Sequence, residues 1–203
     1  MKVTLIAIAG GSGSGKTWLA RELQHRLEPL AAILSLDDFY ADLSHLVPSE
    51  RAARNFDDPE AIDWALFQQC LEGILRGHPV WLPQYDFTTH TRKSRPRRWP
   101  PKPVVLVEGL WPWRHARLRA LYALKVFRAE TEETRFNRRL ARDIEKRGRT
   151  PDSVRQQWSG QVQPMYARFI HPQMRSADVT LSANIPEWRL VRLTQKIQRF
   201  AEG

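Results

Sequence analysis

Short apolar runs alternate with longer stretches of helical periodicity along the chain. Four of these runs, each of four to seven residues, have the length and the β-branched character of strands that are buried on both faces. They cover residues 3–9, 31–36, 104–107 and 124–127. Because helical stretches separate them, the pattern predicts an α/β fold, a doubly wound parallel sheet with flanking helices.

Amphipathic helices are predicted where apolar residues recur every three or four positions. They begin near Lys16, Asp58, Thr131 and Leu190. At the second of these starts, Asp58 is a suitable N-cap and Pro59 a suitable first helical residue, and Gly77 marks the end. A short run at 179–181 predicts one further strand before the last helix.

The composition fits a protein that folds without cross-links. The 203 residues, 42% of them hydrophobic and 27% charged, are expected to form one globular domain over residues 1–203. A chain of this size buries about 70% of the surface that its unfolded form exposes, so it needs no disulfide or structural metal. The single Cys70 lies in a helical pattern and is expected to be a packing residue.

The formal net charge of +10 favours partners that carry phosphate or other anions. It does not choose among nucleotides, nucleic acid and acidic lipid. No run of 18 apolar residues is present, so no transmembrane helix is expected. The apolar residues 3–9 imitate a signal peptide, but cleavage after them would remove the first strand, and we therefore expect a cytoplasmic location.

One basic segment, residues 91–103, contains six basic residues, four prolines and no acid. The prolines predict an exposed loop without regular structure. A solvated loop beside an anionic site is the preferred interpretation. A nucleic-acid contact is the alternative.

The strongest motif follows the first predicted strand and matches GxxxxGK[ST]. Its residues are Gly10, Gly11, Ser12, Gly13, Ser14, Gly15, Lys16 and Thr17. Glycines let backbone N–H groups surround a β-phosphate, the helix N-terminus adds its positive dipole end, and Lys16 reaches the outer phosphates. Thr17 is the expected Mg²⁺ ligand. A flexible Gly-Ser linker is the other interpretation, but a linker does not join a buried strand to an amphipathic helix.

Acidic residues stand at the carboxyl ends of two predicted strands, where ligands of open α/β sheets gather. Asp37 and Asp38 follow the second strand, and Glu108 follows the run at 104–107. A carboxylate in that position can hold Mg²⁺ or accept a proton from an attacking hydroxyl. The residues alone do not divide these roles among the three acids.

A strongly basic helix is predicted near the end of the chain, where residues 135–149 hold seven basic residues against two acids. Arg135, Arg139, Arg142 and Lys146 fall on one side, whereas Phe136, Leu140 and Ile144 fall on another. Without the phosphate loop, a solvated charged face would be the usual interpretation. With it, the segment from about 135 to 160 is predicted to be a basic lid that covers a migrating phosphoryl group.

Seven blocks in order give a specific resemblance. They are GGSGSGKT, SLDDFY, NFDDPEAIDW, PQYDFTTHTR, VEGL, TRFNRRLARDIEKRGR and QPMYARFIHPQMRSADV. Over nearly its whole length the chain resembles the uridine kinase (uridine–cytidine kinase) family of P-loop nucleoside kinases. The resemblance implies transfer of the γ-phosphoryl group of ATP or GTP to the 5′-hydroxyl of uridine or cytidine, with Mg²⁺, in pyrimidine salvage. It also implies small-molecule substrates and a homotetramer.

The resemblance also implies roles for individual residues. Asp37 matches the general base, with Tyr40 beside it, and Asp57 matches the acid that holds the ribose hydroxyls. Tyr85, Phe87 and His90 match the pocket for the pyrimidine base. Glu108 matches the metal-linked acid, which Thr17 and Asp37 accompany. The lid cations are matched by Arg139, Arg142, Arg147 and Arg149, and both Arg147 and Gln157 resemble positions that reach the ribose or the phosphates.

Three positions depart from the family pattern, namely Trp18, Asp58 and Arg128. None of them removes a reacting group, but the donor-base contacts near 182–186 stay unassigned. One alternative is a P-loop kinase for another small hydroxyl substrate, such as pantothenate or a sugar phosphate, and the YDFTTHTR block argues against it. The other is a basic RNA- or DNA-binding module without catalysis. A binding module needs no base, so the intact Lys16 and Asp37 argue against it.

Overall fold

The computed structural model describes residues 2–202 and is built around one parallel sheet of five strands. These strands are β1 (Thr4–Gly10), β2 (Ala31–Ser35), β7 (Val104–Gly109), β8 (Tyr122–Arg128) and β9 (Val179–Leu181). Their order in the sheet is β2-β7-β1-β8-β9, and every neighbouring pair is parallel. All five contain the apolar runs found in the sequence, so the predicted doubly wound sheet is confirmed. Residues 1 and 203 of the predicted domain lie outside the described part.

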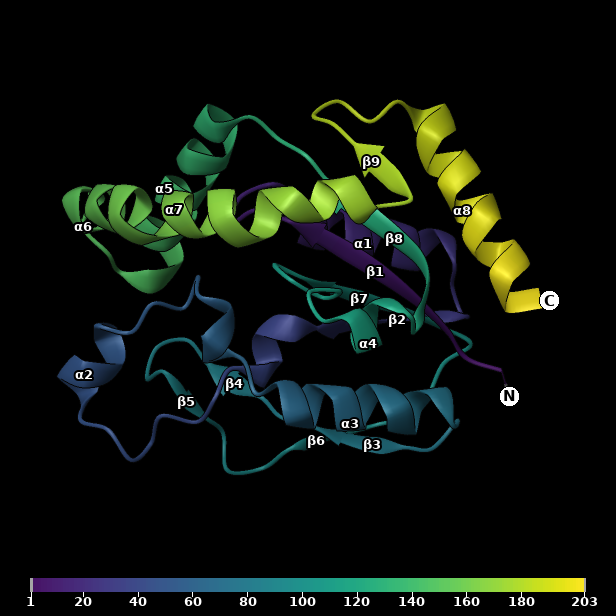
Figure 1. Ribbon diagram of the computed structural model, residues 1–203, viewed down its shortest axis with the longest axis horizontal. Coiled ribbons are helices and arrows are strands. Elements are labelled where there is room, and N and C mark those ends of the chain that lie inside the picture. Colours follow the sequence, from purple (N-terminus) through teal and green to yellow (C-terminus); the bar gives the residue numbers. More distant parts are fainter. Residues whose placement is uncertain (1, 203) are drawn as a thin grey trace.

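Helices cover both faces of the sheet, as Figure 1 shows for α3 on one side and α8 on the other. The main helices packed on the sheet are α1 (Lys16–Arg26), α3 (Trp64–Leu75), α4 (Ala116–Arg119) and α8 (Glu187–Glu202). Alternate residues of β1 serve the two layers. Ile6 and Ile8 belong to the apolar core beneath α1 and α8, whereas Leu5 and Ala7 belong to the core beneath α3. The carboxyl ends of the strands are left free for a site.

The helix predicted to begin at Asp58 begins later, and this part of the prediction is wrong. Asp58 caps a short 3₁₀ turn, Pro59–Ala61, by accepting a hydrogen bond from the N–H of Glu60 (2.9 Å). The extended Ile62 then pairs with Tyr40 through a β-bridge. Asp63 is the N-cap of α3, since its carboxylate accepts from the N–H of Leu66 (3.0 Å).

The basic segment 91–103 was predicted to lack regular structure, and this prediction is also corrected. Two small antiparallel pairs involve it: β3 (Val80–Leu82) with β6 (Arg97–Trp99), and β4 (Tyr85–Asp86) with β5 (Thr91–Arg92). The prolines flank these strands instead of interrupting them. Trp99 is buried in the core beneath α3, so the segment has an apolar anchor among its cations.

The predicted lid is a helical hairpin beside the phosphate loop. It consists of α5 (Glu132–Arg147), α6 (Pro151–Gln157) and α7 (Gln163–Met165), with π-helical turns at Trp158–Val162 and Tyr166–Ile170. Gly148, with φ 62°, ends α5 in the left-handed conformation that favours glycine. The buried residues of α5 are Arg135, Arg139 and Asp143, whereas Ile144 is 40% exposed. The charged side of this helix, and not its apolar side, therefore faces the protein.

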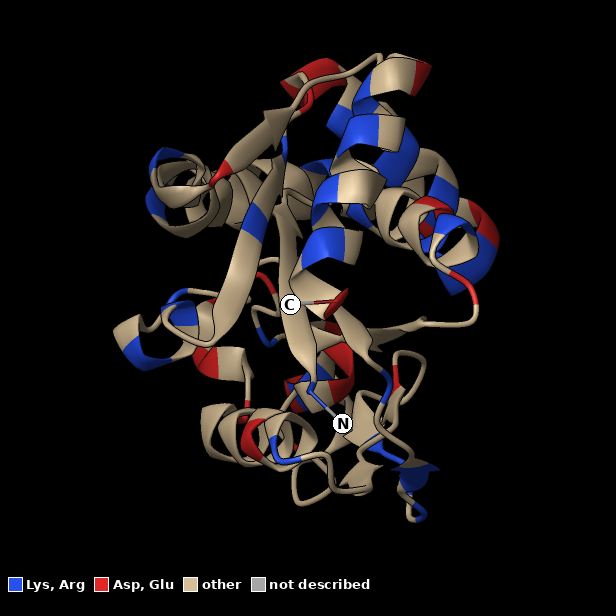
Figure 2. Cartoon of the chain, turned by 90° about the vertical axis from the view of Figure 1, so that its right-hand side faces the viewer, with Lys and Arg blue, Asp and Glu red and all other residues tan. Residues whose placement is uncertain are grey.

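A short helix, α2 (Pro48–Ala52), lies outside these layers in the segment before Phe56. Figure 2 shows Lys and Arg along α8, the helix that ends at the C label, as well as on several other elements. The net positive charge is therefore spread beyond the segment 91–103. Within residues 2–202, no helix is long and apolar enough to cross a membrane.

Candidate active site

The phosphate loop joins β1 to α1 and has the backbone that its glycines permit. Gly13 and Gly15 have φ values of 78° and 89°, a region that other residues rarely adopt. A Cβ on Gly13 would also collide with the carbonyl oxygen of Arg135, so the loop packs directly on α5. Lys16 is the first residue of α1, and the helix N-terminus therefore points at the loop.

Thr17 and Glu108 meet at the tips of neighbouring elements. The Thr17 hydroxyl donates to one carboxylate oxygen of Glu108 (3.4 Å), and the Ser35 hydroxyl donates to the other (3.0 Å). Burial raises the pKa of the Glu108 carboxyl, and the nearby Lys16 ammonium opposes that shift. A hydroxyl and a carboxylate in contact are suitable oxygen ligands for Mg²⁺, which takes few protein ligands when phosphate oxygens supply others. Within residues 2–202, no three His, Cys, Asp or Glu side chains form a closed metal cage.

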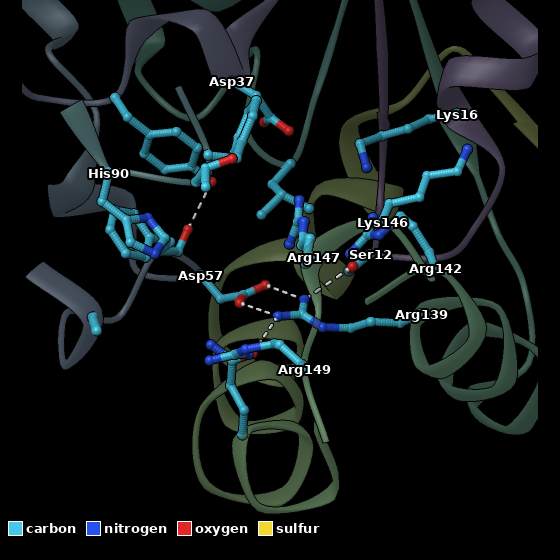
Figure 3. A pocket seen from close by; sticks show the side chains of 17 residues that line it. Ser12, Lys16, Asp37, Asp57, His90, Arg139, Arg142, Lys146, Arg147 and Arg149 are labelled. Carbon is cyan, nitrogen blue, oxygen red and sulfur yellow. Dashed lines mark hydrogen bonds and ion pairs between the residues drawn. The ribbon is translucent and has the colours of Figure 1, made fainter. Parts of the chain in front are cut away.

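A cavity of about 500 Å³ opens beside the phosphate loop (Figure 3). On the side of the loop and the lid, it is lined by the predicted residues Ser12, Lys16, Arg139, Arg142, Arg147 and Arg149. The lid also contributes Gln157, and the predicted residues on the other side are Asp37, Tyr40, Asp57, Phe87 and His90. Figure 3 shows Lys16 and His90 at opposite ends, with Asp37 and Arg147 between them. Residues more than 100 positions apart thus share one space.

Asp37 lies at the centre of the cavity. It belongs to the single 3₁₀ turn Leu36–Phe39 that follows β2, so the sheet fixes its backbone. One of its carboxylate oxygens is buried and has no hydrogen-bond partner among the described residues. Asp38, the next residue, does not line the cavity, and burial raises the pKa of its carboxyl. The two adjacent acids therefore have different surroundings, and only Asp37 is available to a ligand there.

Aromatic rings form the wall around His90. Phe56 stacks on the His90 imidazole with ring centroids 4.4 Å apart and an interplanar angle of 14°. Tyr40 contacts Phe56, Tyr85 and Phe87 at centroid distances of 5.4, 5.2 and 6.4 Å. Tyr85 lies behind this wall and does not line the cavity itself. The rings give a flat, apolar slot at the end opposite Lys16.

Two polar atoms in this wall have no partner within residues 2–202. They are the Tyr85 hydroxyl and Nδ1 of His90, and both are buried. Burial lowers the pKa of His90, and the Arg147 guanidinium adds to the effect, so the imidazole is neutral at pH 7. Buried polar groups without partners are costly, and of these two only His90 belongs to the cavity lining, where a ligand can hydrogen-bond to it.

Two arginines hold this wall in place. Arg92 donates to the backbone carbonyl oxygens of Tyr40 (2.9 Å) and Phe39 (3.4 Å) and pairs with Asp63 (3.1 Å). Arg51 donates to the carbonyl oxygen of Thr89 (3.3 Å), beside His90. The strand pair that carries His90 is thereby fixed to the segment that carries Asp37.

Asp57 and Arg139 form a buried pair between the two sides of the cavity. The two guanidinium NH₂ nitrogens of Arg139 lie 3.4 Å from the two Asp57 oxygens. Arg139 also donates to the Ser12 hydroxyl (3.0 Å) and to Gln157 (2.9 Å), and Arg149 contacts the same Gln157 oxygen. One arginine of the lid therefore touches both the phosphate loop and the acid predicted for the ribose.

Sequence comparisons identify the family. Residues 5–187 match the phosphoribulokinase/uridine kinase family. A uridine kinase from Streptococcus gordonii is 42% identical over 178 residues, covering 87% of this chain and 85% of that protein. A uridine kinase from Streptococcus pneumoniae strain Hungary19A-6 is 38% identical over 200 residues, covering 98% and 94%. The chain belongs to the phosphoribulokinase/uridine kinase family.

Solved structures of this family and of other kinases share the fold. Phosphoribulokinase from Rhodobacter spheroides superposes with a TM-score of 0.65 at 16% identity, covering 89% of this chain and 70% of that one. D-Glycerate 3-kinase from Cryptococcus neoformans gives 0.61 at 21% identity, covering 83% and 79%. At these identities the likeness concerns the fold alone. The expected P-loop kinase architecture and its kinase activity class follow from the family as a whole.

The three departures from the uridine kinase pattern have structural places of their own. Trp18 is 51% exposed on α1, and Asp58 caps the 3₁₀ turn described above. Arg128 ends β8 and donates to the carbonyl oxygens of Leu181 (3.2 Å) and Ala183 (2.8 Å). Arg128 therefore fixes the loop after β9, for which the sequence predicted no contacts.

Sequence reasoning overlooked Phe56 in the cavity wall and Asp143 beneath the lid arginines. Phe56 stacks on His90, and Asp143 is a fully buried carboxylate under the lid arginines. Phe56 stands inside the block NFDDPEAIDW, next to the predicted Asp57, and an aromatic residue there is a signal that could have been used. Asp143 is one of only two acids among the seven basic residues of segment 135–149. An acid among so many cations is a signal that could have marked it as their counter-ion.

Proposed function

We propose that this kinase transfers the γ-phosphoryl group of ATP or GTP to the 5′-hydroxyl of uridine or cytidine, giving UMP or CMP. One observation supports this substrate class most directly. The cavity that contains Lys16 ends in an aromatic slot in which Nδ1 of His90 has no partner among the described residues. A planar, uncharged base with hydrogen-bonding edges suits such a slot.

The donor triphosphate is proposed to lie on the loop. Backbone N–H groups of residues 10–17 and the N-terminus of α1 favour its β-phosphate, and Lys16 favours its outer oxygens. Thr17 and Glu108, already in contact, are the residues that would hold Mg²⁺. When bound, Mg²⁺ supplies charge neutralisation for the phosphate oxygens.

Asp37 is proposed to accept the proton of the attacking 5′-hydroxyl. Its unpartnered oxygen and its place between His90 and Lys16 fit that task. Asp57 is proposed to bind the ribose hydroxyls, and Arg139 beside it keeps the carboxylate paired when a hydroxyl is missing. The cost of a 2′-deoxyribose is then one charge-assisted hydrogen bond, about 1.5–3 kcal/mol. We expect kcat/KM for deoxyuridine to lie roughly 10- to 100-fold below that for uridine.

The lid arginines are proposed to neutralise charge on the migrating phosphoryl group. Arg139, Arg142, Arg147 and Arg149 all line the cavity. The guanidinium carbon of Arg147 lies 5.4 Å from the centroid of the Phe87 ring, so this side chain extends to the aromatic slot. Cations placed in this way act where negative charge is concentrated during transfer.

A substrate screen tests the proposal. The purified protein is incubated with ATP or GTP, Mg²⁺ and single acceptors, and the products are measured by mass. We expect UMP from uridine and CMP from cytidine, and no product from pantothenate or ribulose 5-phosphate. Transfer to one of those two acceptors, with none to either nucleoside, would contradict the proposed function. A homotetramer remains an expectation from the family, which light scattering of the same sample tests.

A further inference from the structure

Asp143 has no role in the reaction proposed above. It is nevertheless the most buried acid of the lid, with no exposed surface. Three arginines converge on it. Nε of Arg142 donates to one oxygen (2.8 Å), Nε of Arg139 lies 3.3 Å from the other, and a terminal nitrogen of Arg147 lies 3.4 Å from the first. Arg139 and Arg147 stand four residues before and after Asp143, so the helix places both beside it.

These three arginines line the cavity, whereas Asp143 does not. The lining contains six cations, Lys16, Arg139, Arg142, Lys146, Arg147 and Arg149, but only two carboxylates, Asp37 and Asp57. Crowded like charges repel one another in a space of low dielectric constant. Burial lowers the pKa of the Arg147 guanidinium, the adjacent Arg142 adds to this, and Asp143 opposes it. Asp143 is therefore the counter-ion beneath the cluster.

The backbone of Asp143 also connects the cluster to the end of α5. Its carbonyl oxygen accepts from the N–H of Gly148, the C-cap, and from the N–H of Arg149 (3.1 Å). These two bonds fix the turn that follows α5, and Arg149 in that turn is one of the lining cations. One residue thus holds three side chains by its carboxylate and a fourth cation by its backbone.

We propose that Asp143 is a positioning residue that holds Arg139, Arg142 and Arg147 as one preassembled unit for the migrating phosphoryl group. The proposal rests on the proposed function. Because Asp143 belongs to the same helix as the three arginines, the backbone of α5 fixes their spacing. Cations that are already arranged do not have to be ordered at the moment of reaction.

The test compares Asp143→Asn with a matched control, Asp152→Asn. Asp152 is also a lid aspartate paired with an arginine (Arg155, 2.9 Å), but its side chain is 94% exposed. Asparagine keeps the size of the buried side chain and one acceptor oxygen, but it loses the charge that offsets three guanidinium groups. We expect kcat with uridine to fall about 10- to 100-fold in Asp143→Asn and its KM for uridine to change less than about threefold. Asp152→Asn should stay within about twofold of wild type.

Two kinetic outcomes would overturn the proposal. One is an Asp143→Asn variant that matches Asp152→Asn, and the other is a rise in the KM for uridine at unchanged kcat. A wild-type protein that does not phosphorylate uridine contradicts the proposed function instead.

A binding measurement tests the proposal without a nucleoside acceptor. MgADP is titrated with and without aluminium fluoride, which imitates the phosphoryl group in transfer. In Asp143→Asn we expect the affinity for the fluoride complex to fall about tenfold or more, with the affinity for MgADP alone unchanged. Equal losses for both ligands would indicate a merely structural role and overturn the proposal.

A folding defect is covered by a second variant. If Asp143→Asn melts below the assay temperature, R142Q/D143N removes one repelling cation together with the carboxylate. Compared with R142Q alone, the double variant should lose further turnover, because Arg139 and Arg147 still depend on Asp143. A double variant equal to R142Q would contradict the proposal.

Discussion

The two ends of the cavity are built in different ways. At the donor end, one continuous motif, residues 10–17, runs from the end of β1 into the start of α1, and its conformation follows from its own glycines. At the acceptor end, three separate segments supply Tyr40, Phe56 and the pair Tyr85 and His90, and these rings contact one another. A local motif specifies the first end, whereas long-range packing specifies the second.

Their chemistry differs as well. The donor end presents Lys16 and the lid arginines, which suit a polyphosphate. The acceptor end presents rings and the unpartnered Nδ1 of His90, which suit a neutral base. Asp37 lies between the ends. Substitutions at Asp37, at the donor end and at the acceptor end should therefore affect turnover, ATP binding and nucleoside binding separately.

The largest effect is expected from Asp37→Asn, at the boundary. The amide keeps the shape of the carboxylate but cannot accept the 5′-hydroxyl proton, so turnover should fall about 10²- to 10⁴-fold. Binding of ATP, measured by calorimetry, should stay within about twofold, because the donor end is intact. Unaltered turnover would exclude Asp37 as the base.

A change at the donor end should act on binding instead. Lys16→Ala removes a charge that contacts the triphosphate before reaction, so the KM for ATP should rise about tenfold or more together with a loss of turnover. Uridine affinity, measured by titration without nucleotide, should change less than about threefold. Similar effects of Lys16→Ala and Asp37→Asn on ATP affinity would contradict the division between the ends.

The same contrast explains what could be predicted from the sequence. The sheet, α1 and the phosphate loop follow from short local patterns, and they agree with the structure. The start of α3 was predicted at Asp58 from its local capping signal. It lies later, at Asp63, because the extended Ile62 is held by Tyr40, which is 22 positions earlier. The segment 91–103 forms strands because Trp99 is buried beneath α3, which its prolines do not reveal. Each error arose where a distant contact outweighs a local preference.

The lid gives the same lesson for side chains. The sequence predicts one basic face of Arg135, Arg139, Arg142 and Lys146. The last three line the cavity, whereas Arg135 packs on the Tyr166 ring instead. The burial of Arg139 and Asp143 was not foreseen, because helical periodicity assigns the apolar side of α5 to the interior. Ion pairs with Asp57 and Asp143 offset the charge of Arg139 inside the protein.

A smaller effect is expected from Arg142→Ala. Arg142 lines the cavity next to Lys146 and is partly exposed, so other cations replace part of its charge. We expect turnover to fall about 10- to 100-fold and the KM for uridine to change less than about threefold. Steady-state kinetics at saturating ATP give both numbers. A defect confined to uridine binding would assign Arg142 to the acceptor end.

The smallest effect concerns discrimination between uridine and cytidine. We expect His90 to keep this discrimination low. Uracil presents an acceptor at position 4 and cytosine a donor, and N3 changes in the opposite sense. The neutral imidazole can present either N–H or a bare nitrogen by changing its tautomer. Nδ1 has no partner within the described chain that would fix one tautomer, and Phe56 holds the ring in one plane. We therefore expect the kcat/KM values for the two nucleosides to differ by less than about a hundredfold.

The pH dependence of that ratio tests the same residue. Burial and Arg147 lower the pKa of His90, so the neutral form, and with it the tautomer choice, persists as pH falls through the ordinary histidine range. Below the lowered pKa the ring carries two N–H donors, which suit the carbonyl of uracil but not the amino group of cytosine. The ratio of kcat/KM for uridine to that for cytidine should then rise several-fold in wild type and stay flat in His90→Ala. A wild-type ratio above about a hundredfold at pH 7, or the same pH response in both proteins, would remove His90 from base selection while leaving the kinase assignment intact.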